Sequence, residues 1–340
     1  MKKYIRNILV LAAVALMMVP VSCKKDDDEI ESKPYMEGNV EFDLPDYIFN
    51  GEKITLTCSG IEKPSNVIYK WRITHYNDTI LGNTVTVRFP DSLANYLVSV
   101  TASDPSGEYY QSTTSKYITV VDTTFATGSL TGVSRGDKFI VDSRDGKAYY
   151  YSTIGSLDWF IQNLEWEGAG SPFANSEVLN HIYGRFYNWN EATGGVKAEG
   201  LGQGPQGAYP EGWSVPTAED WNDLGSALCG KDVKFTEKWS NVGEKLTTVA
   251  YFNGEKLWPY SPEHNSQNEY NWGALPCGFT QSGHTMQDHY YEYGFWWSSS
   301  ERSAGKAYYR YIYWDEPVCG FNYVDEDDMG MNVRCVRLKK

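Results

Sequence analysis

Aromatic side chains near the C-terminus are the residues whose types and spacing most clearly suggest a function. Between residues 290 and 323, 13 of the 34 residues are Phe, Trp or Tyr, although aromatic residues form only 15% of the whole chain. Alternate side chains of a strand point to opposite faces. A strand at 307–314 would therefore carry three tyrosines on one face, Tyr309, Tyr311 and Tyr313. The opposite face, with Ile312 and Trp314, is the expected core face, so the tyrosine face is predicted to meet water.

A tyrosine face of this kind suits recognition rather than catalysis. Each ring offers a flat apolar surface with a polar tip, and ordering it costs little side-chain entropy. The C–H faces of sugars and the surfaces of proteins can both stack against such rings, and nearby Asn and Asp side chains would add hydrogen bonds. The predicted ligand-binding residues are Tyr309, Tyr311, Tyr313, Asn322, Tyr323, Asp325 and Asp327.

Patterns of metal ligands are weak by comparison. His284 and His289 lie five residues apart, which is an awkward spacing for two zinc ligands, and neither CxxC nor HExxH accompanies them. They are expected to be exposed loop histidines, so no metal-binding residues are predicted. The acidic run 325–328 offers the oxygen ligands that calcium prefers, without the ligand order of an EF-hand. Bound calcium and a solvated acidic loop both stay open there, and no other cofactor is expected.

Motifs of enzymes are incomplete. The segment GQGPQG (202–207) matches GxGxxG, but it contains Pro205 and leads into a loop instead of opening a helix. The serines at 298–300 lack the GxSxG elbow of serine hydrolases. No catalytic residues are predicted, and the chain is not expected to be an enzyme.

Charge and composition narrow the classes of partner. The chain has 340 residues, a formal net charge of −14 and a pI near 4.9, without a basic stripe. Nucleic-acid binding needs clustered Lys and Arg, so no nucleic-acid partner is expected. The length and a hydrophobic fraction of 41% indicate two folded domains.

The N-terminus has the pattern of an exported protein. A basic start, MKKYIR, precedes an apolar run that is short for a membrane span and ends at Cys23. We predict a signal peptide over 1–22 and a flexible tether over 23–36. Cys23 resembles the lipidation cysteine of bacterial lipoproteins, and the tract KKDDDE after it resembles the signal that sends Bacteroidetes-type lipoproteins to the outside of the outer membrane. The resemblance implies a lipid anchor at Cys23 in the outer membrane, facing the exterior; a plain solvated charge run is the alternative.

Residues 37–122 have the pattern of an all-β domain. Short β-branched runs such as ITLT and TVTVRF alternate with turns rich in Gly, Pro, Asn and Asp. Their order resembles a PKD or immunoglobulin-like β-sandwich, with Trp71 as the core tryptophan. The resemblance implies a spacer, and a binding surface is the alternative. The Thr-, Ser- and Gly-rich stretch 123–135 is predicted to be a linker.

Residues 136–340 form the second predicted domain. A helix is expected over 217–228, with Thr217 as its N-cap and Asp220 at its third position. A shorter helix is expected over 182–192, and strands with hairpin-like loops are expected after residue 275.

Seven blocks of this second domain occur in the order of a known family. They are FIVDSRDGKAY (139–149), WFIQNL (159–164), GRFYNWNEA (184–192), GWSVPT (212–217) with Trp221, LPCGF (275–279), FWWSS (295–299) and VRCV (333–336). The domain resembles the Fibrobacter succinogenes major paralogous domain, which implies a C-type-lectin-like fold distantly similar to the formylglycine-generating enzymes. The expected fold class is multidomain, an N-terminal all-β PKD/Ig-like sandwich followed by an α+β C-type-lectin-like domain.

The cysteines leave several pairings open. Cys58 stands alone in the first domain, so no inter-sheet disulfide is expected there. Four cysteines of the second domain allow three sets of two disulfides: Cys229, Cys277, Cys319 and Cys335. The family usually has a cysteine just before the GW of GWxxPT, where this chain has Tyr209, Pro210 and Glu211. The resemblance therefore implies that one family disulfide is missing.

These patterns favour a cell-surface lipoprotein whose lectin-like domain binds a glycan or protein ligand. A structural or adhesin-like envelope component without a discrete ligand is the alternative. A catalyst similar to the formylglycine-generating enzymes is a remote third reading, because it would need Cys335 and a second reactive cysteine such as Cys319 in one site.

Overall fold

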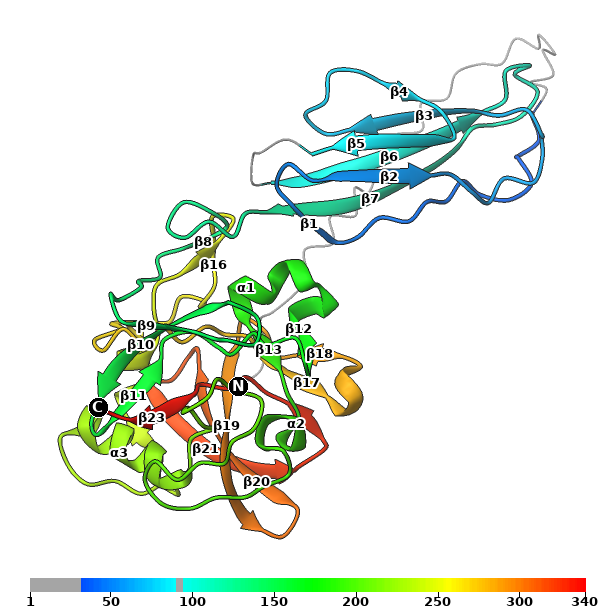
Figure 1. Cartoon of the computed structure of the whole chain (residues 1–340). Coiled ribbons are helices and arrows are strands. Elements are labelled where there is room, and N and C mark those ends of the chain that lie inside the picture. The colour runs from blue at the N-terminus through cyan, green and yellow to red at the C-terminus, as the bar shows by residue number, and fades with distance from the viewer. Residues whose placement is uncertain (1–31, 90–93) are drawn as a thin grey trace, which may run out of the picture.

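A computed structural model describes residues 32–89 and 94–340 of the chain, in two domains (Figure 1). The predicted signal peptide, Cys23 and most of the predicted tether lie outside these residues. Among the residues that are described, none of the helices is long and apolar enough to cross a membrane.

The first domain consists of two β-sheets that share one core. A five-stranded sheet has the order β1-β7-β6-β3-β4, and β2 pairs with β5. The strands are β1 (Tyr47–Phe49), β2 (Lys53–Thr57), β3 (Ile68–Ile73), β4 (Ile80–Leu81), β5 (Thr84–Arg88), β6 (Asn95–Ser103) and β7 (Ser112–Val121). The described residues between 37 and 122 form strands joined by turns and loops, as the sequence pattern predicts.

Alternating side chains build this core. Along β6, every second residue from Tyr96 to Ala102 is fully buried, as the period of a strand with one covered face requires. Trp71 of β3 is also fully buried, as predicted, and its indole N–H donates to the Gly82 carbonyl oxygen at 2.9 Å. Phe42 meets the Trp71 ring edge-on at 5.1 Å.

The segment predicted as a linker lies against the second domain. Its residues Leu130–Thr131 form β8, which pairs with β15 (Tyr251–Phe252). Val121, at the end of β7, is fully buried in a cluster with Phe252 of the second domain. A linker-like composition did not reveal this, because the pairing partner lies about 120 residues away along the chain. Figure 1 shows β8 and β16 next to the end of the sandwich.

The second domain contains five small sheets among the described residues, with few helices. Its remaining strands are β9 (Phe139–Val141), β10 (Ala148–Ile154), β11 (Leu157–Phe160), β12 (Ser171–Pro172), β13 (Arg185–Phe186), β14 (Trp239–Ser240), β16 (Glu255–Lys256), β17 (Phe279–Gln281), β18 (Gln287–Asp288), β19 (Tyr293–Ser303), β20 (Lys306–Tyr313), β21 (Val318–Asp325), β22 (Met329–Gly330) and β23 (Val336–Leu338). The helices are α1 (Asn180–Tyr183), α2 (Trp189–Thr193), α3 (Ala218–Cys229) and α4 (Val242–Leu246), and short 3-10 turns cover Phe173–Asn175, Glu177–Leu179 and Ser282–His284. The chain is thus a β-rich, multidomain protein.

Helix α3 begins as predicted. Thr217 is its N-cap, and its hydroxyl accepts a hydrogen bond from the Asp220 N–H, while the Asp220 carboxylate accepts one from the Thr217 N–H. This reciprocal capping box satisfies two amide groups that the first turn would otherwise leave unpaired.

The prediction of a single helix over 182–192 is wrong. The chain instead forms α1, strand β13 and α2, and the break falls at Gly184, whose φ is +72°. A Cβ at this position would lie 2.6 Å from the side chain of Asn163 and 2.9 Å from the Leu164 carbonyl oxygen. Gly184 therefore lets the backbone pass close to 163–164 and leave the helical path.

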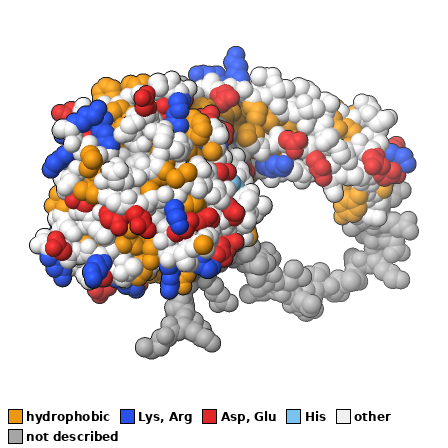
Figure 2. Space-filling view, turned by 60° about the horizontal axis from the view of Figure 1, so that its bottom comes forward, with side chains coloured by type: hydrophobic (Ala, Val, Ile, Leu, Met, Phe, Trp, Pro, Cys, Tyr) orange, Lys and Arg blue, Asp and Glu red, His pale blue; other side chains and the backbone are white. Residues whose placement is uncertain are grey.

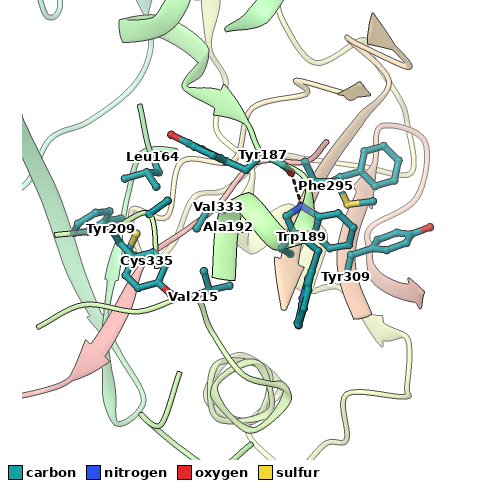
Figure 3. Close-up of a cluster of buried hydrophobic side chains, with 14 of the residues drawn as sticks. Leu164, Tyr187, Trp189, Ala192, Tyr209, Val215, Phe295, Tyr309, Val333 and Cys335 are labelled. Carbon is teal, nitrogen blue, oxygen red and sulfur yellow. Dashed lines mark hydrogen bonds between the residues drawn. The ribbon is translucent and has the colours of Figure 1, made fainter. Parts of the chain in front are cut away.

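The four-stranded sheet β14-β21-β20-β19 is packed on both faces. On one face, Trp297 and Tyr309 belong to a cluster that includes Trp189 of α2, part of which is drawn in Figure 3. On the other face, Trp296 and Ile312 belong to a cluster formed with α3 and α4. A sheet covered on both faces is rigid and hides most of its side chains.

Two buried arginines fix the loops around this sheet. Arg310 donates to the carbonyl oxygens of Phe235 at 2.6 Å and Glu237 at 3.0 Å. Arg334 donates to those of Trp272 at 2.6 Å and Gly273 at 2.9 Å. Burial lowers the pKa of Arg310 to about 10 and that of Arg334 to about 9. Their donors satisfy backbone carbonyls that the long loops would otherwise leave unpaired.

A candidate ligand-binding surface on the C-terminal sheet

Strand register divides the predicted binding residues between the two faces of the sheet. Tyr309 pairs with Asn322 and Tyr311 pairs with Gly320, so Asn322 shares the face of the three tyrosines of β20. Tyr323 pairs with Tyr308, and Asp325 pairs with Lys306, on the opposite face. The predicted set therefore does not form a single site.

Tyr309 is a core residue rather than an exposed one. Its side chain is only 8% exposed and packs near Phe295 and Trp297, with ring centroids 5.8 and 6.3 Å away. Burial raises the pKa of the Tyr309 hydroxyl to about 12. That hydroxyl points away from the other labelled side chains in Figure 3 and hydrogen-bonds to the side chain of Asn322. The prediction of a fully water-facing tyrosine strip fails here, because the cluster around α2 covers this end of the face.

Three half-buried tyrosines lie on the same face beside that cluster. Tyr293 of β19 pairs with Tyr313 of β20, and their rings stack at 4.5 Å with an interplanar angle of 29°. The ring of Tyr311 lies 6.0 Å from that of Tyr293. We call Tyr293, Tyr311 and Tyr313 the tyrosine platform. Sequence reasoning missed Tyr293, which alternates with Phe295 and Trp297 along β19 and could have been found from that period.

Gly320 makes room for the platform. A Cβ built on Gly320 would lie 2.3 Å from Cζ and 2.6 Å from the hydroxyl oxygen of Tyr311. The Tyr311 ring therefore lies across β21 at this position. Any larger residue at 320 would have to displace the ring.

Carboxylates border the platform. Burial raises the pKa of Tyr293 and of Tyr313, and the charges of Glu292 and Glu316 raise both further. The ring N–H of His289 lies 3.0 Å from the Glu292 carboxylate, and the ring itself is 5.4 Å from that of Tyr293. An acidic edge disfavours anionic ligands and suits neutral or positively charged ones.

The remaining predicted residues have other partners. Arg302 lies 4.0 Å above the Tyr323 ring, and Lys306 Nζ lies 2.5 Å from the Asp325 carboxylate. Asp327 accepts a hydrogen bond from the side chain of Asn190 in α2 at 2.8 Å. Within residues 32–89 and 94–340, no three His, Cys, Asp or Glu side chains are grouped so that they could hold a metal ion. Figure 2 shows acidic and basic side chains interspersed on the face that it draws.

Comparison with known proteins identifies the second domain. The family model of the Fibrobacter succinogenes major domain matches residues 153–337, which is more than half of the chain. The chain belongs to this family. No curated protein matches it. The match contains the whole sheet that carries the tyrosine platform.

His284 takes part in a row of carboxylate, imidazole and hydroxyl groups within the family domain. Its Nε2 lies 2.8 Å from the Glu191 carboxylate and its Nδ1 lies 2.8 Å from the Thr280 hydroxyl. The expectation of an exposed loop histidine is wrong, since the His284 side chain is 15% exposed. Thr280 is only 3% exposed, and a nucleophile must be reached by its substrate. The row instead links α2 to β17 through His284, which lies 93 residues after Glu191 in the sequence.

All five cysteines in the described part of the chain are free thiols. Cys335 lies in the same core cluster as Tyr209, and Figure 3 shows the two side by side. Burial raises the pKa of Cys277 to about 12 and that of Cys319 to about 11, and it also raises that of Cys335. Thiols with raised pKa values are poor nucleophiles at neutral pH.

Proposed function

We propose that this chain is a cell-surface lipoprotein whose family domain binds an extended glycan on the tyrosine platform. The observation that carries the proposal is the arrangement of Tyr293, Tyr311 and Tyr313 as neighbouring half-buried rings on one face of a rigid sheet. In the same proposal, the domain is C-type-lectin-like, and the PKD/Ig-like sandwich holds it away from a membrane in which Cys23 is lipidated.

The shape and chemistry of the platform support a glycan. Flat aromatic surfaces stack on the C–H faces of pyranose rings, whereas the exposed amide of Asn322 can hydrogen-bond to sugar hydroxyls. The rings lose little freedom on binding, because strand pairing and Gly320 already hold them. The carboxylates of Glu292 and Glu316 favour a neutral or amino-bearing glycan over an acidic one.

An array of glycans and proteins tests the proposal. The probe is the chain without residues 1–22 and with Cys23→Ser, so that no lipid is attached. We expect binding to neutral or amino-bearing polysaccharides that is lost in the double variant Tyr311→Ala, Tyr313→Ala. Tyr35→Ala is the matched control, because Tyr35 is 80% exposed and its ring lies 5.2 Å from that of Tyr110 in the first domain.

Two outcomes would contradict a glycan. Binding to a protein on the array that the double variant abolishes would make the platform a protein-binding surface. Silence across the whole array would favour an envelope component without a discrete ligand.

A further inference from the structure

A cleft lies where the two domains meet. The first domain contributes Tyr47, Asn95 and Thr119 to this cleft, and the second contributes the β15–β16 hairpin with Glu255 and Lys256, together with Tyr291. Its volume is about 390 Å³. Ligand pockets span about 300–1,000 Å³ and often lie at domain interfaces. The cleft is thus large enough for a small ligand, and neither domain forms it alone.

Contacts across the junction hold the cleft open in one arrangement. The side-chain amide of Asn253 donates to the Val120 carbonyl oxygen at 3.0 Å, and the Asn253 N–H donates to the Ser129 carbonyl oxygen at 2.8 Å. Fully buried Val121 packs in the core cluster of the second domain. A site that is formed before binding saves the free energy of ordering.

Two tyrosine rings line the cleft from opposite domains. Burial raises the pKa of Tyr47 and of Tyr291. Tyr291 has a φ of +64°, a region that bulky residues rarely occupy. Such backbone strain costs about 1–3 kcal/mol and concentrates at ligand sites. Tyr291, one of several non-glycine residues with a positive φ, is thus held where its ring lines the cleft.

Polar groups stand beside these rings. The side-chain oxygen of Asn95 accepts a hydrogen bond from the Thr119 hydroxyl at 2.7 Å, which leaves the Asn95 NH₂ group to donate to a ligand. Asn95, Glu255 and Lys256 are all exposed and offer both donors and acceptors. Rings flanked by an amide, a carboxylate and an ammonium group match the alternating C–H faces and hydroxyls of a sugar.

We propose that the cleft between the domains binds a short saccharide of one or two rings, with a pyranose against Tyr47 and Tyr291 and its hydroxyls on Asn95, Glu255 and Lys256. This site is separate from the tyrosine platform and does not depend on it. Because both domains line it, an occupied cleft also fastens the sandwich to the family domain.

Calorimetric titration with chitobiose, cellobiose and maltose tests this site. We expect at least one of the three to bind, and Tyr291→Ala and Asn95→Ala each to weaken it at least about tenfold, or 1.4 kcal/mol. Asn95 is exposed, so its variant is expected to fold even if Tyr291→Ala does not. Tyr35→Ala serves as the control that leaves the binding unchanged, and the platform variant Tyr311→Ala, Tyr313→Ala shows whether the disaccharide occupies the platform instead.

The outcomes separate this site from the platform. If none of the three disaccharides binds at millimolar concentration, the proposal is overturned while the platform is unaffected. If a disaccharide binds and only the platform variant abolishes it, the proposal is also overturned, because the ligand then occupies the platform.

Discussion

The ring of Tyr311 lies across the backbone of Gly320, and a Cβ on Gly320 would be 2.3 Å from Tyr311 Cζ. This contact holds one of the three rings of the tyrosine platform against the sheet. Since Gly320 sits in a strand that pairs normally with β20, its missing side chain matters for space rather than for backbone freedom.

Gly320→Ala is therefore expected to displace the Tyr311 ring and to weaken glycan binding at least about tenfold, or 1.4 kcal/mol. Binding by titration and the melting temperature are measured together. Gly136→Ala is the matched control, since a Cβ there meets no atom closer than 3.9 Å. Unchanged binding by a folded Gly320→Ala variant would show that the position of Tyr311 is not important.

Asp220 holds a loop as well as the start of α3. Its two carboxylate oxygens accept hydrogen bonds from the Gly202 N–H at 2.6 Å and the Thr217 N–H at 2.9 Å. Asp220→Asn must turn an NH₂ group toward one of these donors, so we expect a loss of about 1–2 kcal/mol in the free energy of unfolding. Denaturant titration measures it, with Asp232→Asn as an exposed control. Equal stability of the two variants would contradict the role given to Asp220.

The same carboxyl gives a pH dependence with a defined sign. Burial raises the pKa of Asp220 from 3.8 to about 6. The folded state thus binds more protons than the unfolded state in this window, so the stability that the proton on Asp220 supplies is present below pH 3.8 and is lost as the pH rises through 6. Asp220→Asn is expected to flatten the unfolding free energy between pH 4 and pH 7, compared with Asp232→Asn. A slope that does not differ between them would rule out this shift.

Even lysine is expected to destabilise the protein when it replaces Arg334. Its guanidinium binds the Trp272 and Gly273 carbonyls and lies 4.4 Å above the Trp272 ring. Lysine lacks the planar guanidinium group that lets arginine donate to several carbonyls at once. Each carbonyl left unpaired costs about 1–3 kcal/mol. Arg334→Lys should therefore lower the free energy of unfolding by about 3 kcal/mol, whereas Arg302→Lys on the exposed end of β19 should change it little. Similar melting temperatures for the two variants would be the contrary result.

Thiol chemistry tests the cysteine assignment. With Cys23→Ser, five thiols remain, and all are free. We expect a thiol reagent to label Cys277, Cys319 and Cys335 only after unfolding, because they are buried and their pKa values are raised. Fewer than five reactive thiols in denaturant without reductant would indicate a disulfide.

The sequence could predict what depends on short spacings. The capping box of α3, the core position of Trp71 and the family blocks all follow from residues close together in the chain. The burial of Tyr309 could not be predicted in this way. The period-2 alternation of a strand assigns residues to faces but does not say which faces are covered. Strand β20 is covered on both faces because α2 packs on one side and α3 on the other, and these helices come from distant parts of the chain.

Two other differences have similar causes. The split of the 182–192 helix at Gly184 reflects a close approach to Asn163, a contact that local helix propensity cannot register. Tyr293 lies just before the family block 295–299, and only its pairing with Tyr313 shows that it belongs to the platform.

The most direct test of the central claim is the dissociation constant of the soluble chain for the glycan selected on the array, measured by titration for wild type and for Tyr311→Ala, Tyr313→Ala. Both proteins should melt cooperatively, so that folding is checked in the same samples. The proposed function predicts that the double variant binds at least about a hundredfold more weakly, or 2.7 kcal/mol. Equal affinity of a folded double variant would show that the glycan binds elsewhere and that the tyrosine platform is not the binding site.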